Sequence, residues 1–247
     1  MPLADRLADS FDRFNRSLDW LGAHVDRPAA GSWISVADLT AADGAALVAR
    51  HGAISARFGQ GQRDVGAAYL MAWIAKAVAH PVAWSWLVDG LAPSLVPDEV
   101  ALREYDGGWF DALAVGTVDA DVGSGGELSG RLVDLLAPMV EALRPRAPIG
   151  YRGLWGAVAD AIAAGTAHAA IHGGRPDSPA VLRAGAAIVE AARPPLPRHP
   201  GFTTVTLAGR PTVIARRSVC CLAYKTGMQF CTTCPVPAAQ AGEQGPG

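Results

Sequence analysis

Four prolines are concentrated in one stretch, Arg193-Pro194-Pro195-Leu196-Pro197-Arg198-His199-Pro200-Gly201, which divides the sequence into two unequal parts. Proline fixes φ and removes a hydrogen-bond donor, so this run favours an extended, semi-rigid connection over a helix or a strand. We therefore expect a helical body at residues 1–192 and a separate C-terminal module at residues 201–235. Residues 236–247 are rich in proline, glycine, alanine and glutamine and predict a disordered tail.

The module begins with a predicted β-hairpin. Apolar and β-branched residues at 202–207 and 212–216 flank Ala-Gly-Arg-Pro at 208–211, which is typical of a turn. The second strand leads directly to the first cysteine of the chain.

The body is predicted to be mostly helical, with one hairpin near residues 100–118 built around Asp-Gly-Gly at 106–108. Apolar periodicity and proline positions predict helices at residues 3–25, from Asp38 or Thr40 to Arg50, and at 63–79, 81–91, 127–143, 154–171 and 179–192. Pro81 is expected to end the helix that precedes it. The predicted fold class is therefore α+β: a predominantly α-helical body with two hairpins.

The chain of 247 residues fits one large domain, or one domain with a small appendage, and its net charge is −2. That charge argues against non-specific nucleic-acid binding. No signal peptide is visible at the start, and Lys76, Pro81 and Asp89 interrupt the most apolar region at residues 65–92. We expect a cytoplasmic protein with no membrane span.

All four cysteines lie within fifteen residues and form the pattern C-C-x9-C-x2-C, at Cys220, Cys221, Cys231 and Cys234. In a cytoplasmic protein, clustered cysteines are more often metal ligands than disulfide partners. Four thiolates suit a [2Fe–2S] cluster, and they also suit a structural zinc ion.

The spacing favours iron–sulfur over zinc. Cys231-x-x-Cys234 points two sulfurs at one metal from a tight turn, whereas the adjacent side chains of Cys220 and Cys221 diverge in an extended chain. Binding both sulfurs to one zinc ion strains the backbone, whereas a cluster with two irons accepts its ligands over a larger area. Zinc remains an alternative, because adjacent ligands can share one ion where the chain turns between them.

Three cations bracket the cysteines: Arg216, Arg217 and Lys225. Positive charge there would favour the reduced, more negative state of a cluster, or would help to dock the substrate. The alternative is that these side chains are solvated ends of the hairpin.

Other candidate features are weaker. Trp84, Trp86, Trp109 and Trp155 could form an aromatic face, but tryptophans are more often core residues. His168 and His172 have the spacing of a metal pair without a supporting H-E-x-x-H pattern, which favours a structural role. Gly59-x-Gly61 and Gly123-x-Gly125 do not open a helix after a strand, so neither predicts a dinucleotide site.

The segment Arg-Arg-Ser-Val-Cys-Cys-Leu-Ala-Tyr, followed by Cys-Thr-Thr-Cys-Pro, resembles the C-terminal motif of the FhuF-type ferric siderophore reductase family. That family carries C-C-x10-C-x2-C, and the interval in this chain is one residue shorter near Gly227. The resemblance covers residues 216–235. It implies that Cys220, Cys221, Cys231 and Cys234 bind a [2Fe–2S] cluster.

The resemblance also implies an enzyme that reduces Fe(III)-siderophores, of hydroxamate type, and releases Fe(II) in the cytoplasm. Peripheral association with the inner membrane face would suit that role. With no recognisable NAD(P)H or flavin site, electrons would come from an external ferredoxin, flavodoxin or related reductase. Two alternatives stay open: a non-catalytic iron–sulfur carrier or sensor, and a zinc-stapled binding module.

Overall fold

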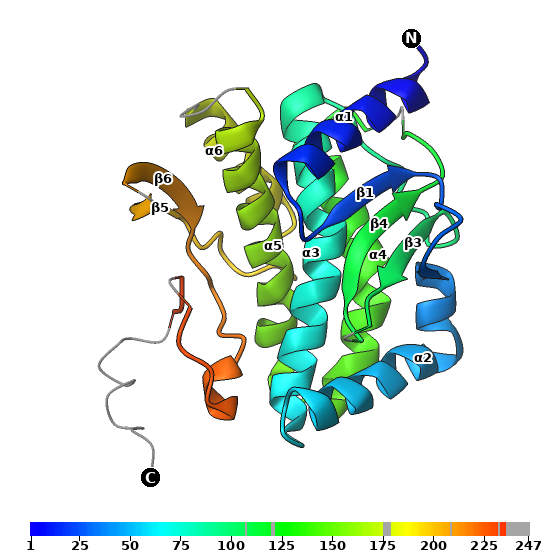
Figure 1. The fold of residues 1–247 in the computed structure, drawn as a ribbon, viewed down its shortest axis with the longest axis vertical. Helices are drawn as coiled ribbons and strands as arrows, with labels where there is room; N and C mark the ends of the chain where they lie inside the picture. Colours follow the sequence, from blue (N-terminus) through cyan, green and yellow to red (C-terminus); the bar gives the residue numbers. More distant parts are fainter. Residues whose placement is uncertain (107, 120–121, 175–178, 208, 232, 236–247) are drawn as a thin grey trace.

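Two long buried helices, α3 (Arg63–Asp89) and α5 (Gly150–His172), pack side by side through the centre of the protein (Figure 1). This computed structural model describes residues 1–106, 108–119, 122–174, 179–207, 209–231 and 233–235. The predicted tail at 236–247 lies outside these residues.

The remaining elements surround this helix pair. Helices α2 and α4 pack on α3, while α6 packs on α5 and α4. The bounds of the other helices, of the strands and of two short 3-10 helices are α1 Leu3–Ser17, β1 Gly22–Val25, β2 Ser32–Ser35, α2 Val36–Arg57, β3 Val100–Glu104, β4 Phe110–Val115, α4 Gly125–Leu143, η1 Arg144–Arg146, α6 Pro179–Ala191, β5 Phe202–Leu207, β6 Arg210–Ala215 and η2 Ala223–Thr226.

A four-stranded sheet in the order β1-β4-β3-β2 covers one side of α3 (Figure 1). Strands β3 and β4 are antiparallel, with Leu102 opposite Leu113, and both of these side chains are fully buried. The predicted hairpin near residues 100–118 is confirmed, as is the hairpin formed by β5 and β6. The α+β class with a predominantly helical body is also confirmed.

The predicted helix at residues 3–25 is wrong beyond Ser17. Leu7, Phe11 and Phe14 form its buried face, and the chain turns out of the helix at Leu18. Residues 22–25 instead form β1, which pairs in parallel with β4. Four residues carry too little pattern to predict a strand, and this one depends on pairing with a strand distant in sequence.

The predicted start of the second helix is also wrong, since Ser35 and neither Asp38 nor Thr40 caps α2. The Ser35 hydroxyl accepts a hydrogen bond from the Asp38 backbone N–H at 3.0 Å, which satisfies a free donor of the first turn. The backbone leaves the helical conformation at residues 41–44, and the helix then resumes and runs past the predicted end at Arg50 to Arg57.

The predicted break at Pro81 is wrong, because α3 runs through it without interruption. A proline inside a helix costs about 3 kcal/mol through its missing donor and a steric clash. Eighteen residues of α3 are buried, and Pro81 is one of them. Burial of this apolar helix offsets the local cost of the proline.

Two helices, α3 and α5, are long and apolar enough by length and composition to cross a membrane. Most of each apolar window, 83% in α3 and 89% in α5, is buried inside the protein. Such helices are equally typical of a buried core, so they are weak evidence for a membrane span.

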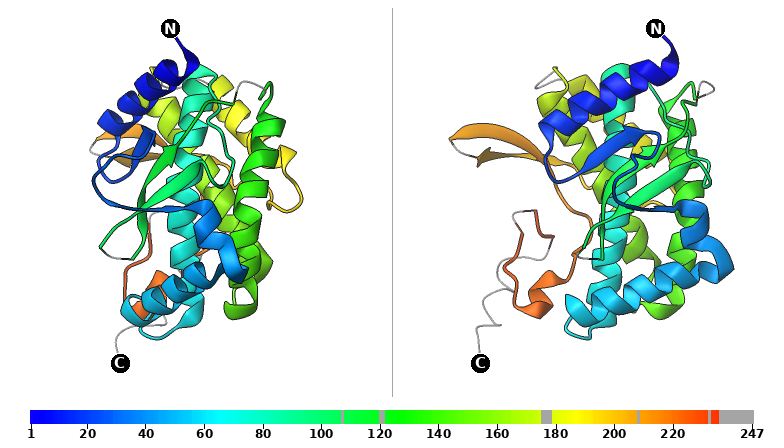
Figure 2. Two further views of the ribbon diagram at one scale, coloured as in Figure 1. Left: turned by 90° about the vertical axis from the view of Figure 1, so that its right-hand side faces the viewer. Right: turned by 45° about the vertical axis from the view of Figure 1, so that its right-hand side comes forward.

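The C-terminal segment returns along the same helix pair. The hairpin of β5 and β6 projects from the body, while β6 packs on α5 and η2 packs on α3 (Figure 2). The chain between β6 and η2 contains Cys220 and Cys221, so the fold holds the cysteine segment beside the two central helices.

Candidate metal centre

Asp160, near the middle of α5, fixes the chain just before the first cysteine pair. Its carboxylate accepts hydrogen bonds from the Ser218 backbone N–H at 2.6 Å and from the Ser218 hydroxyl at 2.7 Å. The Val219 N–H donates to the other carboxylate oxygen at 3.4 Å. Burial raises the pKa of Asp160, and these hydrogen bonds with the charge of Arg217 oppose the rise.

Gly156, one turn before Asp160 on α5, allows this close approach. A Cβ atom at Gly156 would lie 2.2 Å from Cγ1 of Val219, which is far too close for two non-bonded carbon atoms. Val219 therefore docks on bare helix backbone, and it precedes Cys220 directly. The position of the first cysteine pair depends on a glycine and an aspartate of the helical body.

A second anchor holds the chain between the two cysteine pairs. Lys225 forms an ion pair with Asp64 at 2.5 Å, and this hydrogen bond raises the pKa of Lys225. The side-chain amides of Gln60 and Gln62 donate to the backbone carbonyls of Thr226 and Lys225, at 3.2 and 3.3 Å. The segment is thus attached both to α5 and to the N-terminal end of α3.

The sulfur atoms of Cys220 and Cys234 are 3.9 Å apart. Two thiolates bound to one tetrahedral metal at about 2.3 Å lie about 3.8 Å apart, so this pair has the spacing of two ligands on one ion. The Leu222 backbone N–H donates to Cys220 Sγ at 3.3 Å, as amides do to ligand sulfurs. The sequence spacing predicted that Cys231 and Cys234 would direct their sulfurs at one metal. In the structure the sulfur contact is instead between Cys220 and Cys234, which are fourteen residues apart.

Cys221 and Cys231 face the same two cations. Arg217 lies 3.8 Å from Cys231 Sγ and 3.6 Å from the Asp160 carboxylate. Burial lowers the pKa of Arg217, but Cys221, Asp160 and Cys231 outweigh that effect and raise it. Burial and the charge of Arg217 lower the pKa of Lys76 on α3, and Cys221 and Cys231 oppose this.

The donor set of four thiols therefore fits a thiolate-bound metal or cluster, with one pair already at ligand spacing. In the part of the chain that the structure describes, no three cysteine, histidine or acidic side chains stand together closely enough to hold an ion as they are. Binding would require Cys221 and Cys231 to move towards the Cys220–Cys234 pair. Cys231 is exposed and the other three are half-buried.

The thiols resist ionisation where they lie closest together. Burial raises the pKa of Cys220 to about 11, and the neighbouring Cys234 and Cys221 add to the rise. Partial burial raises the pKa of Cys231, but the hydrogen bond and charge of Arg217 prevail and bring it below the usual thiol value. Only a bound cation would hold all four as thiolates.

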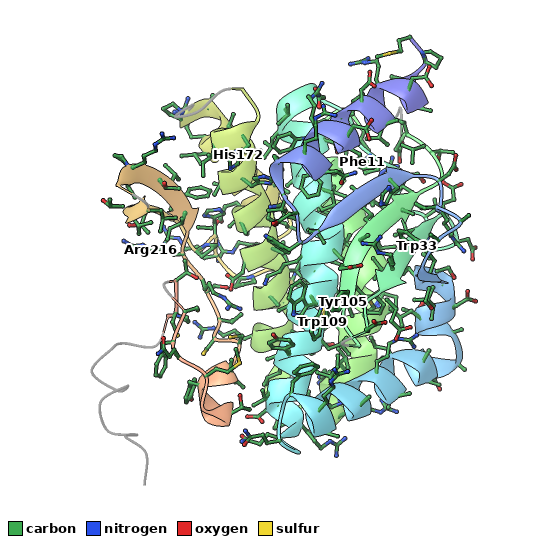
Figure 3. The ribbon with its side chains drawn as sticks, in the orientation of Figure 1. Phe11, Trp33, Tyr105, Trp109, His172 and Arg216 are labelled. Atoms are coloured by element: carbon green, nitrogen blue, oxygen red, sulfur yellow. The ribbon has the colours of Figure 1, made fainter. Side chains whose placement is uncertain are left out.

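A cavity of about 430 Å³ opens beside Cys231, between α3, α5 and β6. Its polar lining residues are Lys76, His80, Asp160, His168, Arg216, Arg217 and Thr233. Figure 3 shows Arg216 beside α5, where the chain leaves β6. Of the three predicted cations, Arg216 and Arg217 line the cavity, whereas Lys225 is held by Asp64 on another side.

Sequence reasoning missed Lys76, His80 and Asp160. The signal that could have found two of them is isolation: Lys76 is the sole lysine, arginine or acidic residue between Asp64 and Asp89 in α3. Asp160 is equally alone in α5 after Arg152. A single charge inside a buried apolar helix requires a partner. Asp160 has its partners in the cysteine segment, whereas Lys76 lies against the rings of Trp73 and Trp20.

The four tryptophans do not form one face. Trp84 and Trp155 are core residues, as expected, with 1% and 3% of their surface exposed. Trp109 instead stacks between Tyr105 and Trp73, with ring centroids 5.2 and 5.7 Å away. Figure 3 shows Tyr105 and Trp109 together, next to α3.

His168 and His172 have ring centroids 4.9 Å apart on α5. His168 hydrogen-bonds to Ser17 and His80, so its role within the described residues is structural, as the sequence favoured. No family model matches this chain, and no curated protein matches it in sequence.

Proposed function

We propose that this chain is a ferric-siderophore reductase whose Cys220, Cys221, Cys231 and Cys234 hold a [2Fe–2S] cluster. The observation that supports the proposal most directly is the 3.9 Å separation of Cys220 Sγ and Cys234 Sγ, on a segment that carries four thiols. Cys220 and Cys234 are not neighbours in the sequence, so the contact between their sulfur atoms results from the fold of the segment and not from adjacency in the chain.

A bound [2Fe–2S] cluster supplies one electron at a time. The ferric chelate gains that electron and becomes a ferrous chelate, and Fe(II) is held far less tightly by hard oxygen ligands. No bond of the siderophore is broken, so no general base or nucleophile is needed. The electron is replaced by an external donor such as a ferredoxin, a flavodoxin or their reductase.

The protein's own side chains have two roles in this scheme. Arg217 and Lys76 hold positive charge beside Cys221 and Cys231 and so favour added negative charge on the sulfurs. The cavity beside Cys231 gives the chelate a place within reach of those sulfurs and excludes water from one side of it. We propose the hydroxamate class and a cytoplasmic location on the resemblance alone.

A structural zinc ion is the second candidate, because the same 3.9 Å sulfur spacing suits a Zn–thiolate site equally well. In that case the four cysteines only fix the segment on α3 and α5. A non-catalytic iron–sulfur carrier or sensor shares the cluster and lacks the reduction step.

The test is a single-turnover assay under anaerobic conditions. Protein reduced with dithionite and desalted is mixed with a ferric trihydroxamate and a chromogenic Fe(II) chelator. We expect about one Fe(II) per reduced cluster, no reaction for Cys231→Ser, and full reaction for the exposed control Thr206→Ser. A cluster that stays reduced in the presence of the ferric chelate would contradict the reductase proposal and favour a non-catalytic iron–sulfur carrier or sensor. NADPH alone is expected to leave the protein oxidised.

A further inference from the structure

The cavity beside Cys231 has an apolar wall made largely of alanine. Small side chains of α3 and α5 form this wall, and Leu18 also lines the cavity. These small residues are Ala72, Ala157, Ala161, Ala164 and Ala167. Helices can approach each other closely here, since a Cβ at Gly165 would lie 3.0 Å from the Cα and the carbonyl oxygen of His80. That approach brings His80 of α3 and His168 of α5 together at the cavity.

A chain of hydrogen bonds fixes which nitrogens of these two imidazoles carry protons. The Ser17 hydroxyl donates its single proton to the Phe14 carbonyl at 2.7 Å. Its oxygen, 3.1 Å from His168 Nε2, must therefore accept from that nitrogen. His168 is then the Nε2–H tautomer, and its Nδ1 is an acceptor. His80 Nε2, 3.2 Å from His168 Nδ1, must be the donor of that bond.

Burial keeps both rings uncharged, which this assignment requires. It lowers the pKa of His80 to about 3, with His168 and Lys76 adding to the effect. It lowers the pKa of His168 to about 4, and the nearby His172 contributes. Each imidazole therefore has one N–H and one lone pair at neutral pH.

The remaining nitrogen of His80 is an acceptor without a partner. His80 lines the cavity with 5% of its surface exposed, and its Nδ1 makes no hydrogen bond to any described residue. A buried acceptor without a partner has lost its hydrogen bond to water, so a ligand group that donates a hydrogen bond to it gains affinity.

Three of the cavity's charged groups already have partners, and the fourth, Arg216, is exposed to solvent. Lys76 Nζ lies 4.6 Å from the ring centroid of Trp73 and 5.7 Å from that of Trp20. Arg217 pairs with Asp160 and contacts Cys231. A ligand that enters beside the alanines therefore meets an apolar wall and one neutral acceptor.

We infer that the cavity binds an uncharged, apolar segment that carries one N–H or O–H donor, such as a methylene chain with a secondary amide, and that the donor bonds to His80 Nδ1. This deepens the proposed function, because it specifies the organic shell of the chelate that would be reduced: amide N–H groups between the iron-binding units. The pocket itself requires no cluster. His80 is a recognition residue in this scheme and takes no part in electron transfer.

The first test uses nitrogen-15 histidine NMR on the full chain, with N-methylacetamide and N,N-dimethylacetamide as probes. The free protein should show His80 protonated at Nε2 and unprotonated at Nδ1. N-methylacetamide should shift the Nδ1 resonance towards that of a hydrogen-bonded nitrogen, and the dimethyl analogue, which lacks the donor, should not. A protonated Nδ1, or equal shifts with both probes, would overturn the inference.

The second test uses redox-inert gallium(III) trihydroxamates, one with secondary-amide spacers and one with N-methylated spacers. We expect the secondary-amide complex to bind about tenfold more tightly, which is the effect of pairing a buried acceptor. His80→Phe should abolish that preference while keeping an aromatic ring, and His24→Phe, on β1, should keep it.

Equal binding of the two gallium complexes by the unmodified protein would contradict the inference whatever His80→Phe does. Because gallium is not reduced, the result is independent of catalysis. Preference for the secondary amide in a protein that reduces no ferric chelate would refute only the proposed function. Reduction of ferric chelates without that preference would refute only the role of His80.

Discussion

Asp160 binds Ser218 twice, through the backbone N–H at 2.6 Å and the hydroxyl at 2.7 Å, two residues before Cys220. A carboxylate buried in a central helix thus positions a segment that the proline run at 193–201 had marked as a separate module. The helical body and the cysteine segment meet through specific contacts, and these contacts can be tested one by one.

Replacing Asp160 by alanine should detach the segment from α5. Three hydrogen bonds and the partner of Arg217 are lost, so we expect a destabilisation of the docked segment of about 2–3 kcal/mol. Limited proteolysis should then cut near residues 216–219, while Asp9→Ala, at an exposed position of α1, should behave like the unmodified protein. Equal protection of the two variants would show that Asp160 does not hold the segment.

Gly156→Ala should displace the first cysteine pair, because its Cβ would occupy the position of Val219. We expect a loss of metal occupancy, and recovery in the double variant Gly156→Ala with Val219→Ala, which restores the space. Gly130→Ala is the matched control: its Cβ meets nothing within 4 Å on α4, so it should gain up to about 1 kcal/mol in stability. The measurement is the metal content of the unmodified protein, of Gly156→Ala, of the double variant and of Gly130→Ala. A double variant that does not regain its metal would contradict the packing argument.

The hairpins and the site were not equally predictable from sequence. Gly-rich turns between apolar runs carry local information, so the hairpins at β3–β4 and β5–β6 could be placed. Strands β1 and β2 could not, because four-residue strands gain their stability from partners distant in sequence. The break predicted at Pro81 was wrong for a related reason. Burial of α3 against α5 outweighs the local tendency of proline to end a helix.

The cysteines were evident from spacing, but their supports were not. Asp160 on α5 lies 60 residues before Cys220, and Gly156 on α5 and Lys76 on α3 lie farther away in the sequence. The close approach of helix backbone to Val219 exists only after folding, and no local pattern encodes it. The sequence identified the four thiols, whereas the cations and carboxylate around them required the structure.

The buried imidazoles should make stability depend on pH below neutrality. The folded-state pKa is about 3 for His80 and about 4 for His168, below the usual value of 6.5. The unfolded chain therefore binds more protons between pH 6.5 and about 4, so the free energy of unfolding falls as pH decreases through that window. Each ring contributes up to about 1.4 kcal/mol per pH unit.

Chemical denaturation at pH 7.0, 6.0 and 5.0 measures this slope. His80→Phe removes one titrating group and should make the profile shallower, even where the variant is less stable at pH 7.0. An unchanged slope in that variant would mean that His80 titrates normally in the folded protein.

Arg217 should set the reduction potential more strongly than Lys225. Arg217 is half-buried beside Cys231, whereas Lys225 is more exposed and is paired with Asp64. Arg217→Gln should move the potential to more negative values, and Arg217→Lys, which keeps the charge, should move it less. A redox titration that gives the larger shift for Lys225→Gln would reverse this assignment.

The most direct measurement is an anaerobic ultraviolet–visible spectrum of the purified full chain before and after dithionite, with iron and zinc counted in the same sample. The account predicts two irons per chain and a reddish protein that bleaches on reduction. Cys231→Ser and Cys234→Ser should lose both the colour and the iron. A colourless protein with one zinc ion per chain, still without iron after anaerobic cluster reconstitution, would contradict the account and make the cysteine segment a zinc-stapled structure.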